Sequence, residues 1–429
     1  MNADGGVASR PPRIDGGDRP DGREDIPANV IAGSLASADG RAEKWLVTIS
    51  LGIVIGYVVV LANLFAHHGW IEDAGGRPGL TDFIEVWSAG SLALSGSAAA
   101  AYDGAMQHAA EVATLGHGFD GEYGWPYPPS FLFVAETLAR LPYLWGFALL
   151  LSASLSLYGL SIAAITRRFA GMIVAFAAPW TLGCALVGQN GFLTAGLFAL
   201  VLLNVEKRPA MSGLLLGLLT YKPQFGLLIP LALAMSGRWR VIGWAAASTA
   251  ILTGLSVEAF GMGALIGFIH ALPRTSQALI TDGAVGWGKL QSAYGLMRCL
   301  GASDLVGWVV QGVVTASCAV AVALVWRSRT AGDLKAASLA LAAIVATPYV
   351  FAYDLPLLGV AAAFVYRHRR FDRADYIALA VAALAFAPFA FVTFPFGLVA
   401  DAAVAVLIGR RLAGDLTRSP RSAAMPVIA

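Results

Sequence analysis

Asp82 is the residue of this chain whose type and position best suit acid–base chemistry. It lies in the sequence Thr-Asp-Phe-Ile-Glu, directly before a moderately apolar, helix-like stretch that ends near Tyr102 and Asp103. An acidic residue in the first turn of a helix can simply stabilise that helix end. A carboxylate close to a membrane surface can also accept the proton of an attacking sugar hydroxyl, which requires only hydrogen-bond reach. The sequence therefore makes Asp82 a candidate general base, with Glu85 as a neighbouring candidate for substrate binding.

Lys222 is a lone basic residue inside a long apolar stretch, followed by Pro223 and Gln224. A lysine at a helix end can extend its ammonium group towards the membrane surface, which is one explanation of this position. Alternatively, the ammonium group could hold a lipid-linked phosphate. Pro223 would then break the helix and free backbone groups for a ligand. We expect Lys222 and Gln224 to bind substrate.

Other polar residues interrupt the apolar chain at points where helices must end. A Trp-Pro-Tyr-Pro-Pro string contains Tyr127, and its residue types are also typical of a helix boundary at the lipid headgroups. A Gly-Gln-Asn turn and a Thr-Pro-containing break can likewise be explained in two ways: they end a helix, or they present polar groups to a substrate. The further substrate-binding candidates are Tyr127, Gln189, Asn190, Tyr349, Tyr353 and Asp354.

We expect no metal and no other cofactor. The loop histidines have no spacing typical of metal ligands, and they are His67, His68, His108 and His117. The three cysteines, Cys184, Cys299 and Cys318, form neither a disulfide framework nor a zinc motif. The net charge of +2 is small and its basic residues are scattered, which argues against nucleic acid as a partner.

The elements that position these residues must be membrane helices. Hydrophobic residues make up 57% of the chain and charged residues only 13%, which is outside the range of soluble domains. The sequence predicts an all-α polytopic membrane protein with about ten to twelve spans. The apolar stretches are 45–66, 131–165, 169–187, 192–205, 241–262, 305–326, 336–346, 355–366, 376–392 and 396–408. Several are short, so some spans must be tilted, extended or re-entrant.

The distribution of charge predicts which loops face the cytoplasm. Basic residues gather in alternate short loops, which the positive-inside rule places inside. These residues are Arg167, Arg168, Lys207, Arg208, Arg238, Arg240, Arg327, Arg329, Lys335, Arg367, Arg369, Arg370, Arg373, Arg410 and Arg411. The loop 67–129 carries eight carboxylates against the single basic residue Arg77, so we expect it outside.

By this alternation, all the polar breaks converge on the outer face of a cell inner (plasma) membrane. Polar residues at membrane depth are costly and usually face a cavity or a functional path. We therefore expect a transmembrane domain of residues 45–410, with a helical first external loop, 67–129, and a second long external loop, 263–304. Residues 1–44 and 411–429 are expected as cytoplasmic tails, the first of them disordered.

Taken together, these motifs resemble glycosyltransferase family 87. Its members are polyprenol-phosphate-mannose-dependent α-1,2-mannosyltransferase-like proteins of the GT-C class. The resemblance rests on Asp82 and Phe83, Tyr102 and Asp103, the Trp125–Pro129 string, Gly188–Asn190, Lys222–Gln224, and Thr347 and Pro348. It implies inverting transfer of a hexose, with mannose the first candidate, from a polyprenyl-phosphate donor to an extracytoplasmic glycan or lipid acceptor. It also implies that Asp82 is the base.

Two points qualify the expected site. Where the resembled mannosyltransferases carry a His near the late Pro-containing motif, this chain has Tyr349, Tyr353 and Asp354, so the resemblance leaves the donor and the acceptor open. Arg274, Lys289 and Arg298, in the second external loop, are further candidates for the donor phosphate. The rival interpretation is a transporter or flippase, because broken helices and membrane-embedded polar groups occur there as well.

Overall fold

The computed structural model describes Met1 and residues 28–121 and 123–418, and this part of the chain is built from eighteen α-helices without a β-strand. Two isolated bridges, between Glu72 and Pro78 and between Leu290 and Phe351, are its only extended pairings. The prediction of an all-α protein is confirmed. The predicted tails lie outside the described residues over 2–27 and 419–429.

The helix bounds follow the apolar stretches closely in the first half of the chain. The α-helices are α1 Ala28–Ala66, α2 Phe83–Leu94, α3 Gly104–Leu115, α4 Leu132–Ala139, α5 Tyr143–Thr166, α6 Phe169–Phe176, α7 Pro179–Val187, α8 Gly191–Asn204, α9 Pro209–Leu219, α10 Ile229–Met235, α11 Trp239–Phe260, α12 Met262–Ser276, α13 Ala293–Cys299, α14 Asp304–Arg327, α15 Gly332–Val345, α16 Pro356–His368, α17 Arg373–Phe386 and α18 Gly397–Arg418.

Short 3-10 and π segments connect these helices at several of the predicted breaks. The 3-10 helices are η1 Ala98–Tyr102, η2 Pro129–Phe131, η3 Pro223–Gly226, η5 Trp287–Lys289, η6 Ala352–Asp354 and η7 Ala387–Ala390, and η4 Gln277–Thr281 is a π-helix. Prolines stand at the start of η2, η3, α7, α9 and α16, where the missing N–H does not break a helical hydrogen bond.

Within the described residues, five helices are long and apolar enough to cross a membrane on their own. They are Arg41–Ala66, Tyr143–Thr166, Trp239–Phe260, Asp304–Arg327 and Arg373–Ala390. The pair α6 and α7 would make a sixth span, but it bends by 73° at its break. Fewer helices pass this test than the ten or more spans expected, because prolines and glycines divide the apolar sequence into shorter helices such as α8, α9 and α10.

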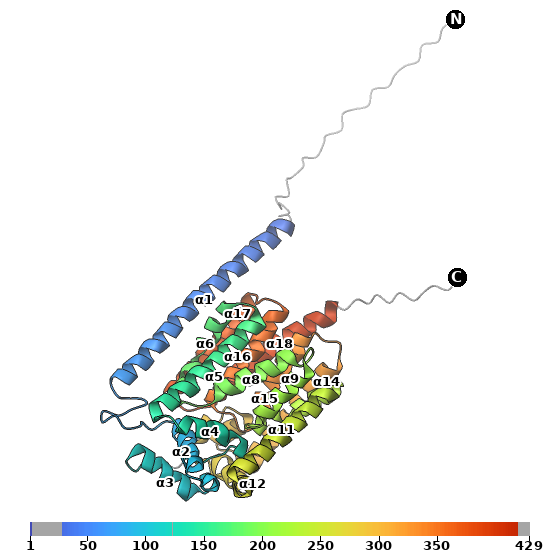
Figure 1. Cartoon of the computed structure of the whole chain (residues 1–429). Coiled ribbons are helices and arrows are strands. Elements are labelled where there is room, and N and C mark those ends of the chain that lie inside the picture. Colours follow the sequence, from blue (N-terminus) through green and yellow to red (C-terminus); the bar gives the residue numbers. More distant parts are fainter. Residues whose placement is uncertain (2–27, 122, 419–429) are drawn as a thin grey trace.

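Helix α1 begins at Ala28, before the apolar stretch that was expected to start the first span at Trp45. Residues 28–44 are rich in alanine, the residue with the best helix propensity, so the helix can extend into the predicted tail. Along its spanning part, α1 is almost fully exposed and packs mainly on α6. It stands at one flank of the molecule (Figure 1).

The remaining helices form a bundle with a helical cap at one end. Helix α8 packs between α5, α9 and α16, and α15 packs against α16. The loop 67–129 is helical as expected, and its α2 and α3 gather with α4 and α12 at the end opposite the start of α1 and the end of α18 (Figure 1). Gly90 allows α2 to pack closely on α4, because a Cβ there would lie 2.1 Å from the Ala135 carbonyl oxygen. The cap thereby holds Asp82 and Glu85 against the bundle.

Candidate active site

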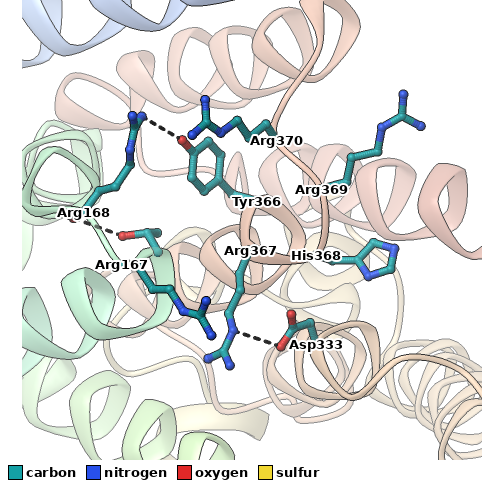
Figure 2. Close-up of a pocket in the computed structure, with 9 residues that line it drawn as sticks. Arg167, Arg168, Asp333, Tyr366, Arg367, His368, Arg369 and Arg370 are labelled. Carbon is teal, nitrogen blue, oxygen red and sulfur yellow. Dashed lines mark hydrogen bonds and ion pairs between the residues drawn. The ribbon is translucent and has the colours of Figure 1, made fainter.

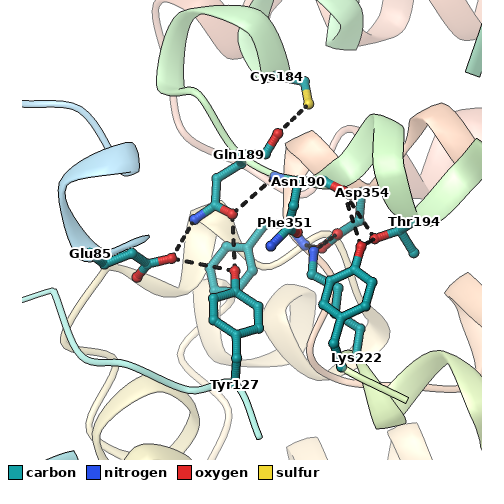
Figure 3. Close-up of polar contacts among 10 residues, drawn as sticks. Glu85, Tyr127, Cys184, Gln189, Asn190, Thr194, Lys222, Phe351 and Asp354 are labelled. Atoms are coloured by element: carbon teal, nitrogen blue, oxygen red, sulfur yellow. Dashed lines mark hydrogen bonds and ion pairs between the residues drawn. The ribbon is translucent and has the colours of Figure 1, made fainter. Parts of the chain in front are cut away.

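Three of the predicted substrate-binding side chains meet in one hydrogen-bond cluster beneath the cap. The Gln189 amide Nε2 donates to Glu85 Oε1 at 3.0 Å, and the Tyr127 hydroxyl lies 3.1 Å from Gln189 Oε1 and 3.4 Å from Glu85 Oε1. All three side chains are buried. Figure 3 shows them facing one another from α2, from the Trp-Pro-Tyr-Pro-Pro string and from the turn before α8.

Lys222 and Asp354 form a second, buried cluster next to the first. Lys222 Nζ donates to Asp354 Oδ1 at 2.7 Å, and the Phe351 backbone N–H donates to Asp354 Oδ2 at 3.1 Å. The ammonium group also lies 5.0 Å from the centre of the Tyr353 ring. Lys222 is therefore neutralised by a carboxylate 132 residues further along the chain, instead of standing alone as the sequence suggested.

The start of α8 connects the two clusters. The Asn190 carbonyl oxygen accepts hydrogen bonds from the Thr194 hydroxyl at 3.1 Å and from the Tyr221 hydroxyl at 3.3 Å. Tyr221 directly precedes Lys222 in the sequence. Gly191 follows, and a Cβ at this position would lie 1.7 Å from the carbonyl oxygen of Tyr353. Only a residue without a side chain allows α8 to approach η6 this closely.

We expect Gly191→Ala to destabilise the protein by about 1–3 kcal/mol, because the new methyl group forces backbone apart in a packed region. Gly183→Ala, in the neighbouring α7, is the matched control, since a Cβ there meets nothing within 4 Å. Thermal unfolding in detergent measures both. Equal midpoints for the two variants would mean that α8 and η6 can separate freely, which contradicts the close contact.

Asn190 is the polar side chain of the site with capacity left for a ligand. It is 1% exposed, and neither its Oδ1 nor its Nδ2 has a hydrogen-bond partner with good geometry among the described residues. The amide lies beside the Tyr127 hydroxyl and lowers the pKa of that hydroxyl, against the larger effect of burial, which raises it. Because a buried amide without partners is costly, Asn190 is suited to bind a hydroxyl group of a substrate.

Asp82 lies at the N-terminus of α2, partly exposed at the edge of this region. Its side chain makes no capping hydrogen bond, so Asp82 does not stabilise the start of α2 in the way that N-cap residues usually do. Burial raises the pKa of Asp82 to about 6, although the Gln189 amide and the charge of Lys289 both lower it. Lys289 itself is exposed. A carboxylate with this pKa can take up a proton near neutral pH.

The neighbouring Glu85 is in a different electrostatic state. Burial raises the pKa of Glu85 well above its usual range, and the negative charges of Asp82 and Glu111 raise it further. The hydrogen bond from Gln189 and the charge of Lys222 lower the pKa, but by less. Two adjacent carboxyl groups whose environments differ in this way can divide the roles of acid and base. Asp82 is the member of the pair that ionises more easily.

Sequence reasoning missed two residues that support Glu85 from α3. Gln107 Nε2 donates to the Glu85 backbone carbonyl and to Glu111 Oε1, each at 3.1 Å, and both side chains are fully buried. Gln107 and Glu111 are four residues apart, so they share one face of the helix. The sequence feature that indicates them is this spacing of two polar residues within a helix whose N-cap is Asp103.

Other candidates lie outside the two clusters. Gln224 is partly buried, and Tyr349 packs with Ile280, Leu290 and Tyr294 in a separate small core. Arg298 is occupied with the carbonyl oxygens of Ala302 and Thr281 and with the Trp287 ring, whereas Arg274 is exposed.

The described residues contain no group of three or more His, Cys, Asp and Glu side chains arranged to hold a metal ion. Together with Asp82, Asn190 and Lys289, the two clusters offer a partly exposed carboxylate, two buried amides and two ammonium groups. This set can bind hydroxyl groups, take up a proton and stabilise an anion.

Comparison with known proteins places the chain in a family. The family model described as glycosyltransferase family 87 matches residues 125–351, which is more than half of the 429 residues. This range includes Tyr127, Gln189, Asn190 and Lys222 but neither Asp82 nor Asp354. No curated protein and no solved structure matches the chain. The resemblance seen in the sequence is confirmed, and the chain belongs to glycosyltransferase family 87, a family of membrane glycosyltransferases.

Proposed function

We propose that this glycosyltransferase moves a hexose, with mannose as the first candidate, from a polyprenyl-phosphate donor to an extracytoplasmic glycan or lipid acceptor, inverting the anomeric carbon. The observation that carries the proposal is Asp82, whose carboxylate has a pKa of about 6, does not cap α2 and lies beside buried hydroxyl-binding groups, as suits a general base. The donor class is supported by the membrane fold, because a lipid-linked substrate reaches such a site from the bilayer.

In this mechanism Asp82 accepts the proton of the acceptor hydroxyl as its oxygen bonds to the anomeric carbon. The bond from that carbon to the phosphate oxygen breaks, and the polyprenyl phosphate leaves as an anion. Cations beside the leaving group stabilise the charge that develops in the transition state. Asn190 and Gln189 would orient the sugar, with Glu85 and Tyr127 holding the Gln189 amide in place.

We assign the main contact with the donor phosphate to Lys289. Its ammonium group is exposed and close enough to Asp82 to lower the pKa of that carboxyl group. Lys222 already has a carboxylate partner, so it adds little net charge. Its role is to fix η6 and Tyr353 beside the sugar.

The face of the membrane is part of the proposal. Asp82 and Glu85 belong to α2 in the cap, whereas Arg168, in the loop between α5 and α6, pairs with Glu43 in the first half of α1, which begins at the opposite end of the molecule (Figure 1). Because basic loops remain cytoplasmic, this arrangement supports a plasma-membrane protein whose site faces outward.

The test of the proposed donor uses purified protein and membranes that contain acceptors. Radiolabelled mannose is supplied as polyprenyl-phosphate-mannose or as its nucleotide sugar. Transfer from the lipid-linked donor alone is the expected result. Transfer from the nucleotide sugar alone would contradict the proposal, and uptake of the labelled lipid without transfer would favour the transporter interpretation.

The rate of transfer should depend on pH through Asp82. A base must be ionised, so kcat/KM should fall about tenfold per pH unit below the pKa of about 6 and level off above it. Lys289→Ala removes a charge that favours the ionised form, and it should move the inflection to higher pH. A flat profile of kcat/KM from pH 5 to 8, measured with the acceptor well below its KM, would exclude Asp82 as the base.

A further inference from the structure

A cavity of about 510 Å³ opens at the end of the molecule opposite the proposed active site. Its lining includes five arginines and a histidine: Arg167, Arg168, Arg367, His368, Arg369 and Arg370. Figure 2 shows these side chains around the junction of α5, α6, α15 and α16. The cavity is separate from Asp82 and its neighbours.

The chain brings these arginines together from two distant segments. Arg167 and Arg168 form the link between α5 and α6, and Arg367 to Arg370 form the end of α16 and the loop that follows. Arg168 Nη1 donates to the Tyr366 hydroxyl at 3.2 Å, across 198 residues of sequence. This contact joins the two segments.

Only part of the positive charge is balanced by carboxylates. Arg168 pairs with Glu43 of α1, and Arg367 pairs with Asp333 at 3.3 Å. His368 lies 3.3 Å from Asp415. The other three arginines, Arg167, Arg369 and Arg370, are exposed and form no ion pair with a described residue. The cavity therefore keeps a surplus of positive charge.

Arg167 occupies a backbone conformation that does not favour a long side chain. Its φ is +58°, in the left-handed region that glycine adopts most readily. An L-residue is strained in this conformation, because its Cβ approaches the following carbonyl oxygen. The position thus keeps a guanidinium group at the cavity at some expense in local stability.

The positive-inside rule explains basic residues in a cytoplasmic loop, but it does not require them to surround one concave space. Like charges held this close repel each other, and an anion between them removes the repulsion. Guanidinium groups bind phosphate oxygens in pairs of parallel hydrogen bonds. The cavity also lies at the C-terminal ends of α5 and α16, and basic pockets between membrane helices bind lipid headgroups in other proteins.

We propose that this basic cavity binds a phosphate-bearing anion, with Arg167, Arg369 and Arg370 as its main ligands. The phosphate belongs either to the headgroup of an anionic phospholipid or to a soluble phosphate compound. This binding site is independent of the function proposed for Asp82, and it does not require transfer activity.

The experiment measures ligand-dependent thermal stabilisation of the full chain in neutral detergent, because a ligand that binds only the folded state raises its stability. The probes are short-chain phosphatidylglycerol, inorganic phosphate and, as a neutral control, short-chain diacylglycerol. The test variant is the triple substitution Arg167→Gln, Arg369→Gln and Arg370→Gln. Its matched control removes the same charge from exposed arginines outside the cavity, namely Arg208→Gln, Arg240→Gln and Arg329→Gln.

We expect the wild type and the control triple to bind phosphatidylglycerol with similar Kd, and the cavity triple to bind at least about tenfold more weakly. Binding of phosphatidylglycerol without inorganic phosphate identifies a lipid headgroup, and binding of both identifies the phosphate itself. If the triple variant does not fold, single Arg369→Gln and Arg370→Gln variants should each weaken binding by a smaller factor. No binding of either probe to the wild type, or equal weakening in both triples, would overturn the proposal.

Discussion

Asp82→Asn is expected to lower the rate of sugar transfer by about 10²–10⁴-fold, the usual contribution of a positioned general base. Asparagine keeps the size of the side chain but cannot accept the proton of the acceptor hydroxyl. Because Asp82 makes no capping hydrogen bond, thermal unfolding should change little. The measurement is initial transfer of radiolabelled mannose from polyprenyl-phosphate-mannose by equal amounts of purified protein.

Asp120→Asn is the matched control for this variant, since Asp120 is an exposed acidic residue in the same external loop. It should transfer at the wild-type rate. Glu85→Gln separates the two carboxyl groups of the site: it should weaken substrate binding and raise KM more than it lowers kcat. Full activity of Asp82→Asn, or a larger loss of kcat in Glu85→Gln, would transfer the role of base to Glu85.

Lys222→Met is expected to destabilise the protein by about 3–5 kcal/mol, because it leaves the Asp354 carboxylate buried without its partner. The two side chains are only 4% and 2% exposed, so water cannot replace the missing ammonium group. The double variant Lys222→Met, Asp354→Leu should recover much of this loss, since no uncompensated charge remains. Thermal and denaturant unfolding of Lys222→Met, of Asp354→Leu and of the double variant measure the coupling between the two residues.

An exposed ion pair provides the comparison for this effect. Glu136 and Arg140 form an i,i+4 pair on the surface of α4, and Glu136→Gln should cost less than about 1 kcal/mol. If Lys222→Met is as stable as the wild type but has lost transfer, the ammonium group acts on the substrate. Lys222 would then hold the donor phosphate, as the sequence first suggested, and Lys289 would not be needed for it.

The sequence predicted which polar segments come together, because alternation of basic and acidic loops places each break on one side of the membrane. Glu85, Tyr127 and Gln189 are separated by up to 104 residues, yet they form one hydrogen-bond cluster. The helical nature of the first external loop was also predictable from its composition. Asp82, at the start of α2, remains a prediction from its residue type, its position and the family resemblance.

Pairings between distant side chains could not be predicted in the same way. Lys222 was expected to be a free cation, since nothing in its own segment indicates that Asp354 faces it. Gln107 and Glu111 were overlooked because burial of a helix face depends on its packing against α2. Five of the expected spans are single helices long and apolar enough to cross a membrane, whereas prolines and glycines divide other apolar stretches into shorter helices, which the apolar sequence alone did not show.

Because α1 makes few contacts with the other helices, few of its side chains are constrained by packing. Glu43 pairs with Arg168, and the Tyr57 hydroxyl donates to the Ala177 carbonyl oxygen at 3.2 Å. The two residues are 14 positions apart, or about four helical turns, so they point in the same direction from the helix axis. These two polar contacts therefore fix the rotation of α1 about its own axis. On the exposed face of α1, away from α6, one apolar side chain can replace another, because little of that face packs against protein.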